Sequence, residues 1–114
     1  MKKSGNKYGA KKVYAYGLKF DSQKEFMRYN QLRMLKKAGD VLEFKHQVPF
    51  LYEHEGKKMF KYIADYVVTW KDGTETIEDV KGFNKKTGKF LTTPLFNLKK
   101  KLIEAQHKIT ITLV

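Results

Sequence analysis

The sequence predicts one α/β domain in which helices flank a mixed β-sheet. The 114 residues are enough for a single hydrophobic core and too few for two. Hydrophobic residues make up 41% of the chain and aromatic residues 14%, a composition that opposes disorder throughout. Helical and alternating patterns of hydrophobic residues follow one another in the order α, β, β, β, α, β.

The first helix is predicted from about Ser22 to Ala38. Ser22 and Glu25 fit the S-x-x-E capping box, hydrophobic residues recur at helical spacing after them, and Gly39 provides a stop. Residues 1–12 mix Lys, Gly, Ser and Asn with little periodicity. We therefore expect a flexible basic arm before a single domain that spans 13–114 and opens with a short extended segment.

Three strands are predicted after the first helix, because β-branched and aromatic residues alternate there with polar ones. The segments and their turns are Val41 to Tyr52, a turn at Glu55-Gly56, Met59 to Trp70, a turn at Lys71-Asp72-Gly73, and Thr74 to Lys81. A loop that contains Lys and Gly follows the third strand.

A second helix and a last strand complete the predicted fold. Thr93 and Pro94 suit the N-cap and first positions of a helix that runs to about Gln106. Ile111 and Leu113 then alternate with threonine, which indicates a strand. Because this strand follows a crossover helix, we expect it to join the sheet parallel to an earlier strand.

The net charge of +12 is concentrated in two segments. Residues 1–20 carry six Lys and no acid, and residues 81–103 carry seven Lys and no acid. This pattern favours a polyanionic partner such as DNA; a solubilising surface or an anionic membrane patch is the alternative. The candidate DNA-binding lysines are Lys11, Lys12, Lys85, Lys86, Lys89, Lys99 and Lys100.

The absence of cysteine excludes disulfides and thiolate metal sites, so a metal would be held by carboxylate, imidazole or carbonyl groups. The start Met1-Lys2-Lys3 is not followed by the apolar run of a secretory signal, and no stretch reaches membrane-spanning length. We expect a cytoplasmic protein, with no membrane partner and no small-molecule cofactor.

Asp65 is the most unusual residue, because it lies in the middle of the predicted second strand. An ionised carboxylate is unfavourable there unless it is paired or binds a metal. On the third strand, Asp79 and Lys81 share one face by alternation. Asp65 joins that face only if the intervening turn has an odd number of residues.

The length of the turn at Lys71-Asp72-Gly73 therefore decides the site. A two-residue loop would place Asp65 opposite Val80, with the wrong parity. A three-residue turn with Gly73 in the left-handed conformation places Asp65 opposite Asp79 instead. We predict the three-residue turn or an equivalent bulge.

Directly opposed residues bring their Cβ atoms to ~5 Å, so the two carboxylates repel each other unless a divalent cation lies between them. Asp65 and Asp79 would hold Mg²⁺ or Mn²⁺, together with the Val80 carbonyl and waters. Lys81 would orient or deprotonate the attacking water and offset charge in the transition state. The alternative is a cross-strand ion pair of Asp65 with Lys81, with Asp79 at the solvated end of its strand.

With Ala64-Asp65 on one strand and Asp79-Val80-Lys81 on the next, within the order αβββαβ, the chain resembles the PD-(D/E)XK nuclease superfamily. It looks most like small phage-type endonucleases with a basic arm, such as Holliday junction resolvases. The resemblance covers nearly the whole chain, although Ala64 replaces the proline of the family name. It implies a restriction-endonuclease-like core and a homodimeric, Mg²⁺-dependent endodeoxyribonuclease. Branched DNA in phage recombination or replication, in the host cytoplasm, is the implied setting.

The resemblance also suggests further site residues. A glutamate of the first helix joins the metal site in many members, which points to Glu25; a purely capping role is the alternative. Gln47 resembles a polar residue on the strand before the acid, although it could be ordinary strand polarity. A lysine of the second helix, Lys99 or Lys100, is expected near the phosphate. The rival hypothesis is a non-catalytic nucleic-acid-binding module on a nuclease-like scaffold.

Overall fold

The computed structural model describes residues 11–114, so nearly all of the expected basic arm lies outside the described residues. The elements, in chain order, are β1 (Val13–Ala15), β2 (Leu18–Phe20), α1 (Gln23–Ala38), β3 (Val41–His54), β4 (Lys57–Trp70), β5 (Glu75–Asp79), β6 (Phe83–Asn84), β7 (Lys89–Phe90), α2 (Pro94–His107) and β8 (Ile111–Leu113).

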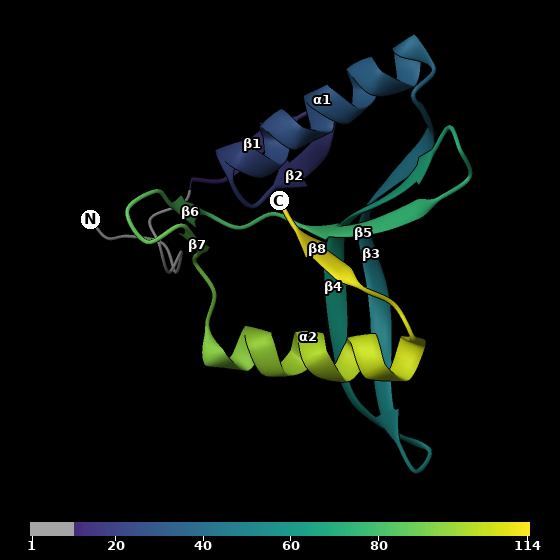
Figure 1. Cartoon of the computed structure of the whole chain (residues 1–114), viewed down its shortest axis with the longest axis vertical. Helices are drawn as coiled ribbons and strands as arrows, with labels where there is room; N and C mark the ends of the chain where they lie inside the picture. Colours follow the sequence, from purple (N-terminus) through teal and green to yellow (C-terminus); the bar gives the residue numbers. More distant parts are fainter. Residues whose placement is uncertain (1–10) are drawn as a thin grey trace.

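A mixed four-stranded sheet with the order β3-β4-β5-β8 forms the centre of the fold (Figure 1). β3, β4 and β5 are antiparallel neighbours, and β8 pairs with β5 in parallel, as the crossover helix predicted. Figure 1 shows α1 over the end of the sheet where β4 meets β5, and α2 across the long β3–β4 hairpin. The structure is thus α/β, with a mixed sheet flanked by two helices. Neither of these helices has the length and apolar character of a transmembrane span.

Both helices begin and end at the residues that the sequence indicated. The Ser22 hydroxyl accepts a hydrogen bond from the Glu25 N–H at 3.0 Å, and Thr93 Oγ1 accepts one from the Phe96 N–H at 3.1 Å. Gly39 closes α1 with a φ of 89°, a left-handed conformation that glycine adopts without strain. The predicted helices are confirmed.

The turn between β4 and β5 has the odd length that we predicted. Gly73 has a φ of 90°, and its N–H donates to the Trp70 carbonyl at 2.9 Å. The Trp70 N–H in turn donates to the Thr74 carbonyl at 2.8 Å, so these two residues flank a three-residue turn. The observed ladder continues this register to the pair Tyr66 and Glu78.

The hydrophobic core has two parts, one beneath each helix. Ile103 of α2 packs with Tyr62, Ala64, Ile77 and Ile111 of the sheet. Leu32 of α1 packs with Val41, Tyr66 and Val68. The two parts meet along β4, which places the middle of β4 between the helices.

The structure corrects the predicted extent of the third strand and adds two hairpins. β5 ends at Asp79 rather than at Lys81, because the Val80 N–H donates to the Asp65 side chain instead of to a neighbouring strand. The extended segment before α1 is the β1–β2 hairpin, and the loop after Lys81 contains the β6–β7 hairpin.

Candidate active site

The predicted catalytic residues meet in one cleft. Extending the pairing of Tyr66 with Glu78 by one residue places Asp65 directly opposite Asp79. Both carboxylates line a cleft of about 870 Å³, and so do Glu25, Val80 and Lys81. The cleft lies between the start of α1, the middle of β4, the end of β5 and the start of α2.

Asp65 is held across the two strands by the backbone of Val80. Its Oδ2 accepts a hydrogen bond from the Val80 N–H at 2.7 Å. Burial, the Asp79 carboxylate and the Glu25 carboxylate raise the pKa of Asp65 from its usual 3.8 to about 8, although the Val80 N–H and Lys81 oppose this rise. The ionised form of Asp65 is therefore unfavourable without a further cation.

Asp79 is only 4% exposed. Its Oδ2 accepts a hydrogen bond from the Tyr62 hydroxyl at 2.5 Å, and its Oδ1 forms an ion pair with Lys81 Nζ at 2.9 Å. Oδ1 nevertheless accepts no hydrogen bond with suitable geometry from any residue in 11–114. Oδ1 therefore depends on the Lys81 ammonium to compensate its burial.

Lys81 forms its ion pair with Asp79, and not with Asp65 as the alternative interpretation expected. Asp79 is also buried, so it does not lie at a solvated strand end. The Lys81 ammonium lies 4.1 Å from the centre of the Phe96 ring, which holds it at the wall of the cleft. That alternative is therefore wrong for both residues.

Tyr62 is a site residue that the sequence did not reveal. Alternation places Tyr62 and Asp65 on opposite faces of β4, and tyrosines in such a segment usually belong to the core. Burial and the Asp79 carboxylate raise the pKa of Tyr62 far above its ordinary value. The hydroxyl thus stays protonated and acts as a donor to Asp79.

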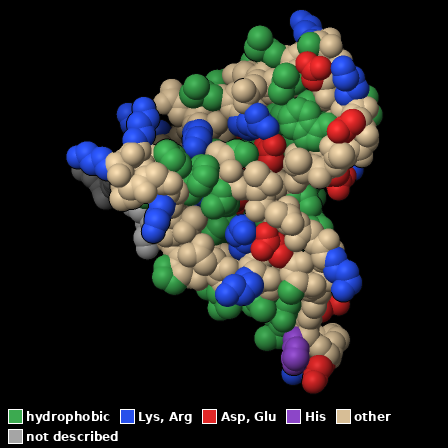
Figure 2. Space-filling model, in the orientation of Figure 1, with side chains coloured by type: hydrophobic (Ala, Val, Ile, Leu, Met, Phe, Trp, Pro, Cys, Tyr) green, Lys and Arg blue, Asp and Glu red, His purple; other side chains and the backbone are tan. Residues whose placement is uncertain are grey.

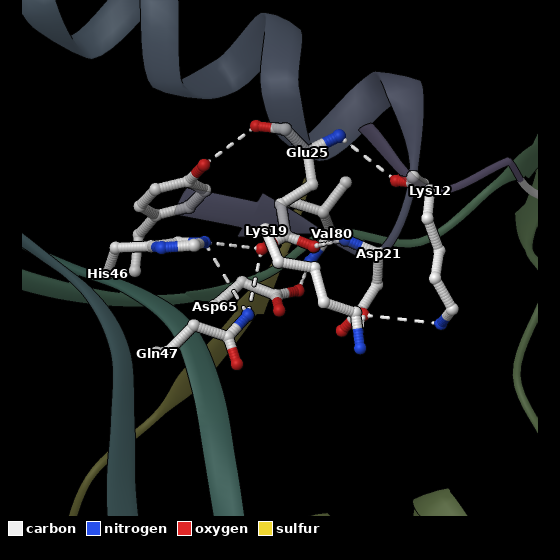
Figure 3. A network of polar contacts seen from close by, with 10 residues as sticks. Lys12, Lys19, Asp21, Glu25, His46, Gln47, Asp65 and Val80 are labelled. Atoms are coloured by element: carbon white, nitrogen blue, oxygen red, sulfur yellow. Dashed lines mark hydrogen bonds and ion pairs between the residues drawn. The ribbon is translucent and has the colours of Figure 1, made fainter. Parts of the chain in front are cut away.

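Glu25 caps α1 and also lines the cleft. Its Oε1 accepts a hydrogen bond from the Asp21 N–H at 3.0 Å, so the side chain caps α1 one residue before the expected Ser22. Its Oε2 accepts one from Gln47 Nε2 at 2.8 Å and lies 2.6 Å from His46 Nε2 (Figure 3). The side chain is 2% exposed, and it lies close enough to Asp65 to raise that residue's pKa.

Gln47 reaches Glu25 because of a local change in its backbone. Its φ is 61°, a left-handed conformation that is rare for a residue other than glycine. The pairs on either side, His46 with Tyr66 and Val48 with Ala64, place Gln47 across from Asp65. Figure 3 shows the Gln47 amide next to Asp65, with its nitrogen directed towards Glu25. Gln47 is thus more than an ordinary polar residue of a strand, because it binds the Glu25 carboxylate. His46 also contacts Glu25, although its position in the sequence gave no indication of this.

Glu78, the acid next to Asp79, has a separate role. Arg28 of α1 donates from Nε to Glu78 Oε1 at 2.8 Å and from Nη2 to Oε2 at 2.6 Å. This two-pronged, nearly buried ion pair ties α1 to β5. Of Glu78 and Asp79, only Asp79 therefore points into the cleft.

A lysine that we did not predict also lines the cleft. Lys24 Nζ donates to the Lys81 carbonyl at 2.6 Å, and it lies 5.3 Å from the centre of the Phe90 ring. This contact joins the first turn of α1 to the chain that leaves β5.

The predicted DNA-binding lysines occupy different places. Lys11 lines the cleft, and Lys12 lies 3.7 Å from Asp21. Lys85, Lys86 and Lys89 are exposed on the β6–β7 hairpin. On α2, Lys99 lies over the Phe60 ring and Lys100 pairs with Glu104 at 3.0 Å, so neither lines the cleft in this structure.

Oxygen atoms are the available ligands for a cation in the cleft. Within residues 11–114, no group of three or more His, Asp or Glu side chains has an arrangement suited to a metal. Mg²⁺, however, often uses one or two carboxylates and completes its shell with waters and substrate phosphates. Asp65, Asp79 and the Val80 carbonyl could serve a cation in that way.

A family model described as "Protein of unknown function (DUF1064)" matches residues 5–113. The match covers nearly the whole chain, including each residue of the cleft. No curated protein and no solved structure matches the chain.

Proposed function

We propose that this chain, which belongs to the DUF1064 family, is a metal-dependent endodeoxyribonuclease that hydrolyses DNA phosphodiester bonds in the cleft around Asp65 and Asp79. One observation carries the proposal. Half-buried Asp65 and buried Asp79 lie opposite each other when the β4–β5 register is extended by one residue, with Lys81 paired to Asp79. Such crowding is unfavourable in an ordinary core and useful around a cation.

The donor set fits a hard divalent cation, Mg²⁺ or Mn²⁺, held by Asp65, Asp79 and the Val80 carbonyl. Tyr62 donates to Asp79 Oδ2, and the Lys81 ammonium pairs with Oδ1, the oxygen that a cation would share with Lys81. When bound, the cation would polarise the scissile phosphate and stabilise the leaving oxygen.

The other cleft residues support the same chemistry. Lys81 carries a positive charge within 2.9 Å of Asp79, where it could orient a water and offset charge on the phosphate in the transition state. Glu25 is held by Gln47 and by the Asp21 N–H, so its carboxylate is fixed above Asp65 as a further acceptor for a water or cation. Lys11 and Lys24 add positive charge to the walls of the cleft.

We also propose that this α/β fold is a restriction-endonuclease-like core. The order α1, β3, β4, β5, α2, β8 supports it, with the β1–β2 and β6–β7 hairpins as additions. We also propose DNA as the partner and a homodimer as the active form, because two strands must be cut by a small domain. Branched DNA in phage recombination or replication, in the cytoplasm, remains the setting that the resemblance suggests.

A non-catalytic nucleic-acid-binding module is the second candidate. It is favoured by the lack, within residues 11–114, of a three-membered group of His, Asp or Glu suited to a metal. The opposed carboxylates of Asp65 and Asp79 weigh against it, because a protein that only binds phosphates gains nothing from placing negative charge in the cleft.

Cleavage assays separate the two candidates. Linear, single-stranded, flapped and four-way DNA should be incubated with Mg²⁺, Mn²⁺ or EDTA, and we expect cleavage of at least one substrate with metal only. The Asp79→Asn variant should bind DNA and not cut it, since it keeps an acceptor for Tyr62 and loses the charge. Glu43→Gln, which neutralises an exposed carboxylate of β3, is the matched control and should cut normally.

Two results would contradict the proposal. Binding without cleavage of any substrate, with either metal, would support the non-catalytic module. Full activity of a correctly folded Asp79→Asn variant, judged by circular dichroism, would remove the assignment of the cleft.

A further inference from the structure

The β6–β7 hairpin rises directly from the wall of the cleft. A single residue, Gly82, separates it from Lys81, and the Leu91 N–H closes its base by donating to the Gly82 carbonyl at 2.8 Å. A Cβ at Gly82 would lie 3.2 Å from Leu91 Cδ1, so the two sides of the base are in close contact. Gly82 and Leu91 both line the cleft, and Figure 1 shows the hairpin projecting from this edge.

The tip of the hairpin is an ordered turn. Asn84 Oδ1 accepts hydrogen bonds from the Lys86 N–H at 2.9 Å and the Thr87 N–H at 3.2 Å. The Asn84 carbonyl accepts another from the Gly88 N–H at 2.8 Å, with Gly88 in the left-handed conformation at a φ of 70°. This framework presents three exposed lysines to solvent: Lys85, Lys86 and Lys89.

Phe83 is the feature of this hairpin that core packing does not explain. Its ring meets Phe90 edge-to-face at a centroid distance of 5.0 Å, yet 47% of Phe83 remains exposed. Phe90 is contacted in turn by Lys24 of α1, whose Nζ lies 5.3 Å from the ring centre. The Phe83 side chain is thus held by Phe90 and remains partly open to solvent beside the cleft.

The charge around Phe83 points to a polyanion. Residues 81–103 contain seven Lys and no acid. Figure 2, in the orientation of Figure 1, shows Lys and Arg side chains along the edge where the hairpin projects. An exposed aromatic ring flanked by lysines is the combination that binds single-stranded nucleic acid, because the ring stacks on a base while the cations contact phosphates.

We propose that the β6–β7 hairpin binds an unpaired nucleobase next to the scissile phosphate, with Phe83 stacked on the base and Lys85, Lys86 and Lys89 on the flanking phosphates. The location of the base relative to the cut rests on the proposed nuclease function. A base within a continuous duplex is already stacked on its neighbours and offers no face to Phe83. The preferred substrate class is therefore DNA that is single-stranded beside the cut.

Binding in EDTA tests the hairpin independently of cleavage. The probe is a short single-stranded oligonucleotide containing 2-aminopurine, measured by anisotropy and by quenching of the analogue, with a duplex of the same sequence as reference. Phe83→Ala should weaken single-strand binding by about 5- to 150-fold and abolish the quenching. Duplex binding should change by less than about two-fold, because only an unpaired base can stack.

Two companion variants keep the test decisive. Phe83→Trp should restore binding, since a larger ring can stack, which would show that the alanine variant fails through the lost ring. Met59→Ala removes an exposed hydrophobic side chain (57% exposed) near the turn of the β3–β4 hairpin, and it should leave binding unchanged.

The lysines of the hairpin are tested by salt dependence. Replacing Lys85, Lys86 or Lys89 by Gln should lower the slope of log binding constant against log salt concentration by roughly 0.7 for single-stranded DNA.

The results also separate this inference from the proposed function. Three results would show that the hairpin proposal is wrong, whatever the cleavage assay shows. Phe83→Ala could bind single strands as tightly as the unchanged protein, or it could lose affinity for the duplex and for single strands to the same extent. The unchanged protein could also bind no single strand. Unchanged binding would favour an acidic protein partner at this surface. If Phe83 is required for binding and no DNA is cut, base stacking by the hairpin stands, while the nuclease proposal and the position of the base beside a cut fail.

Discussion

Replacing Asp65 by asparagine should stabilise the metal-free protein at neutral pH. The Asp65→Asn side chain would keep an oxygen that accepts the Val80 N–H, the hydrogen bond that Asp65 makes at 2.7 Å. The substitution would make permanent the neutral state that Asp65 otherwise reaches only by taking up a proton near Asp79 and Glu25. Most substitutions at a well-bonded strand residue destabilise a protein, so a gain in stability would be diagnostic of crowded carboxylates.

The size of the gain follows from the pKa of Asp65, which burial and its neighbours raise from 3.8 to about 8. Between these two values the folded state holds a proton that the unfolded state has released. The stability from this proton is therefore complete below the lower pKa and is lost as the pH rises from there through the higher one. At pH 7 this linkage amounts to an upper bound of about 4 kcal/mol. Relaxation and water entry reduce the expected gain to about 1–3 kcal/mol, or roughly 5–15 °C in Tm.

Thermal unfolding followed by circular dichroism at pH 5 and pH 8, in EDTA, measures the effect. The unchanged protein should lose stability between these pH values, and Asp65→Asn should lose less. Addition of Mg²⁺ at pH 8 should raise the Tm of the unchanged protein and not that of the variant, because a cation offsets the paired charges. Glu43→Gln, at an exposed position of β3, is the control for simple charge removal.

A lower Tm of Asp65→Asn in EDTA at pH 8 would refute the reasoning. The reasoning would also be refuted if Asp65→Asn and the unchanged protein lost the same amount of stability between pH 5 and pH 8. In either case Asp65 would be an ordinary hydrogen-bond acceptor, and the argument for a cation between Asp65 and Asp79 would lose its physical basis.

Two further substitutions test the supports of the cleft. Tyr62→Phe removes only the hydroxyl that donates to Asp79, so we expect the fold to persist. The Mg²⁺ concentration for half-maximal cleavage should rise several-fold, because Tyr62 orients a metal ligand. A metal titration with an unchanged midpoint would exclude this orienting role of Tyr62. Arg28→Leu leaves Glu78 as an unpaired, buried carboxylate and should cost about 3–5 kcal/mol in urea unfolding at neutral pH, with partial recovery in the Arg28→Leu, Glu78→Gln double variant. A loss below about 1 kcal/mol would show that water compensates Glu78.

Much of the fold could be predicted because its signals are local. Ser22, Gly39 and Thr93 satisfy the orphan backbone groups at helix ends, and each does so within a few residues of itself. The sequence allowed either a two-residue loop or a three-residue turn before Thr74, and the structure has the three-residue turn with Gly73 in the left-handed conformation. That turn places Asp65 opposite Asp79, so the centre of the site was one of two arrangements that the sequence allowed.

The rest of the site depends on contacts between residues that are far apart in the chain. Glu25 and Gln47 meet because β3 carries a left-handed residue at Gln47, which alternation alone does not predict. Tyr62 reaches Asp79 although it lies on the opposite face of β4 from Asp65 by simple alternation. Lys24 lies at the cleft, where Lys99 or Lys100 of α2 was expected. This is because the start of α1 approaches the end of β5.

The sequence by itself determined the helices, the strands and the shared face of Asp79 and Lys81, because capping and alternation act over a few residues. Only the tertiary structure decided which groups contact each oxygen of Asp79, which groups hold Glu25, and that a basic hairpin with an exposed Phe83 borders the cleft. Those features arise from the packing of distant segments, where burial and hydrogen-bond competition choose among partners that the sequence leaves equivalent.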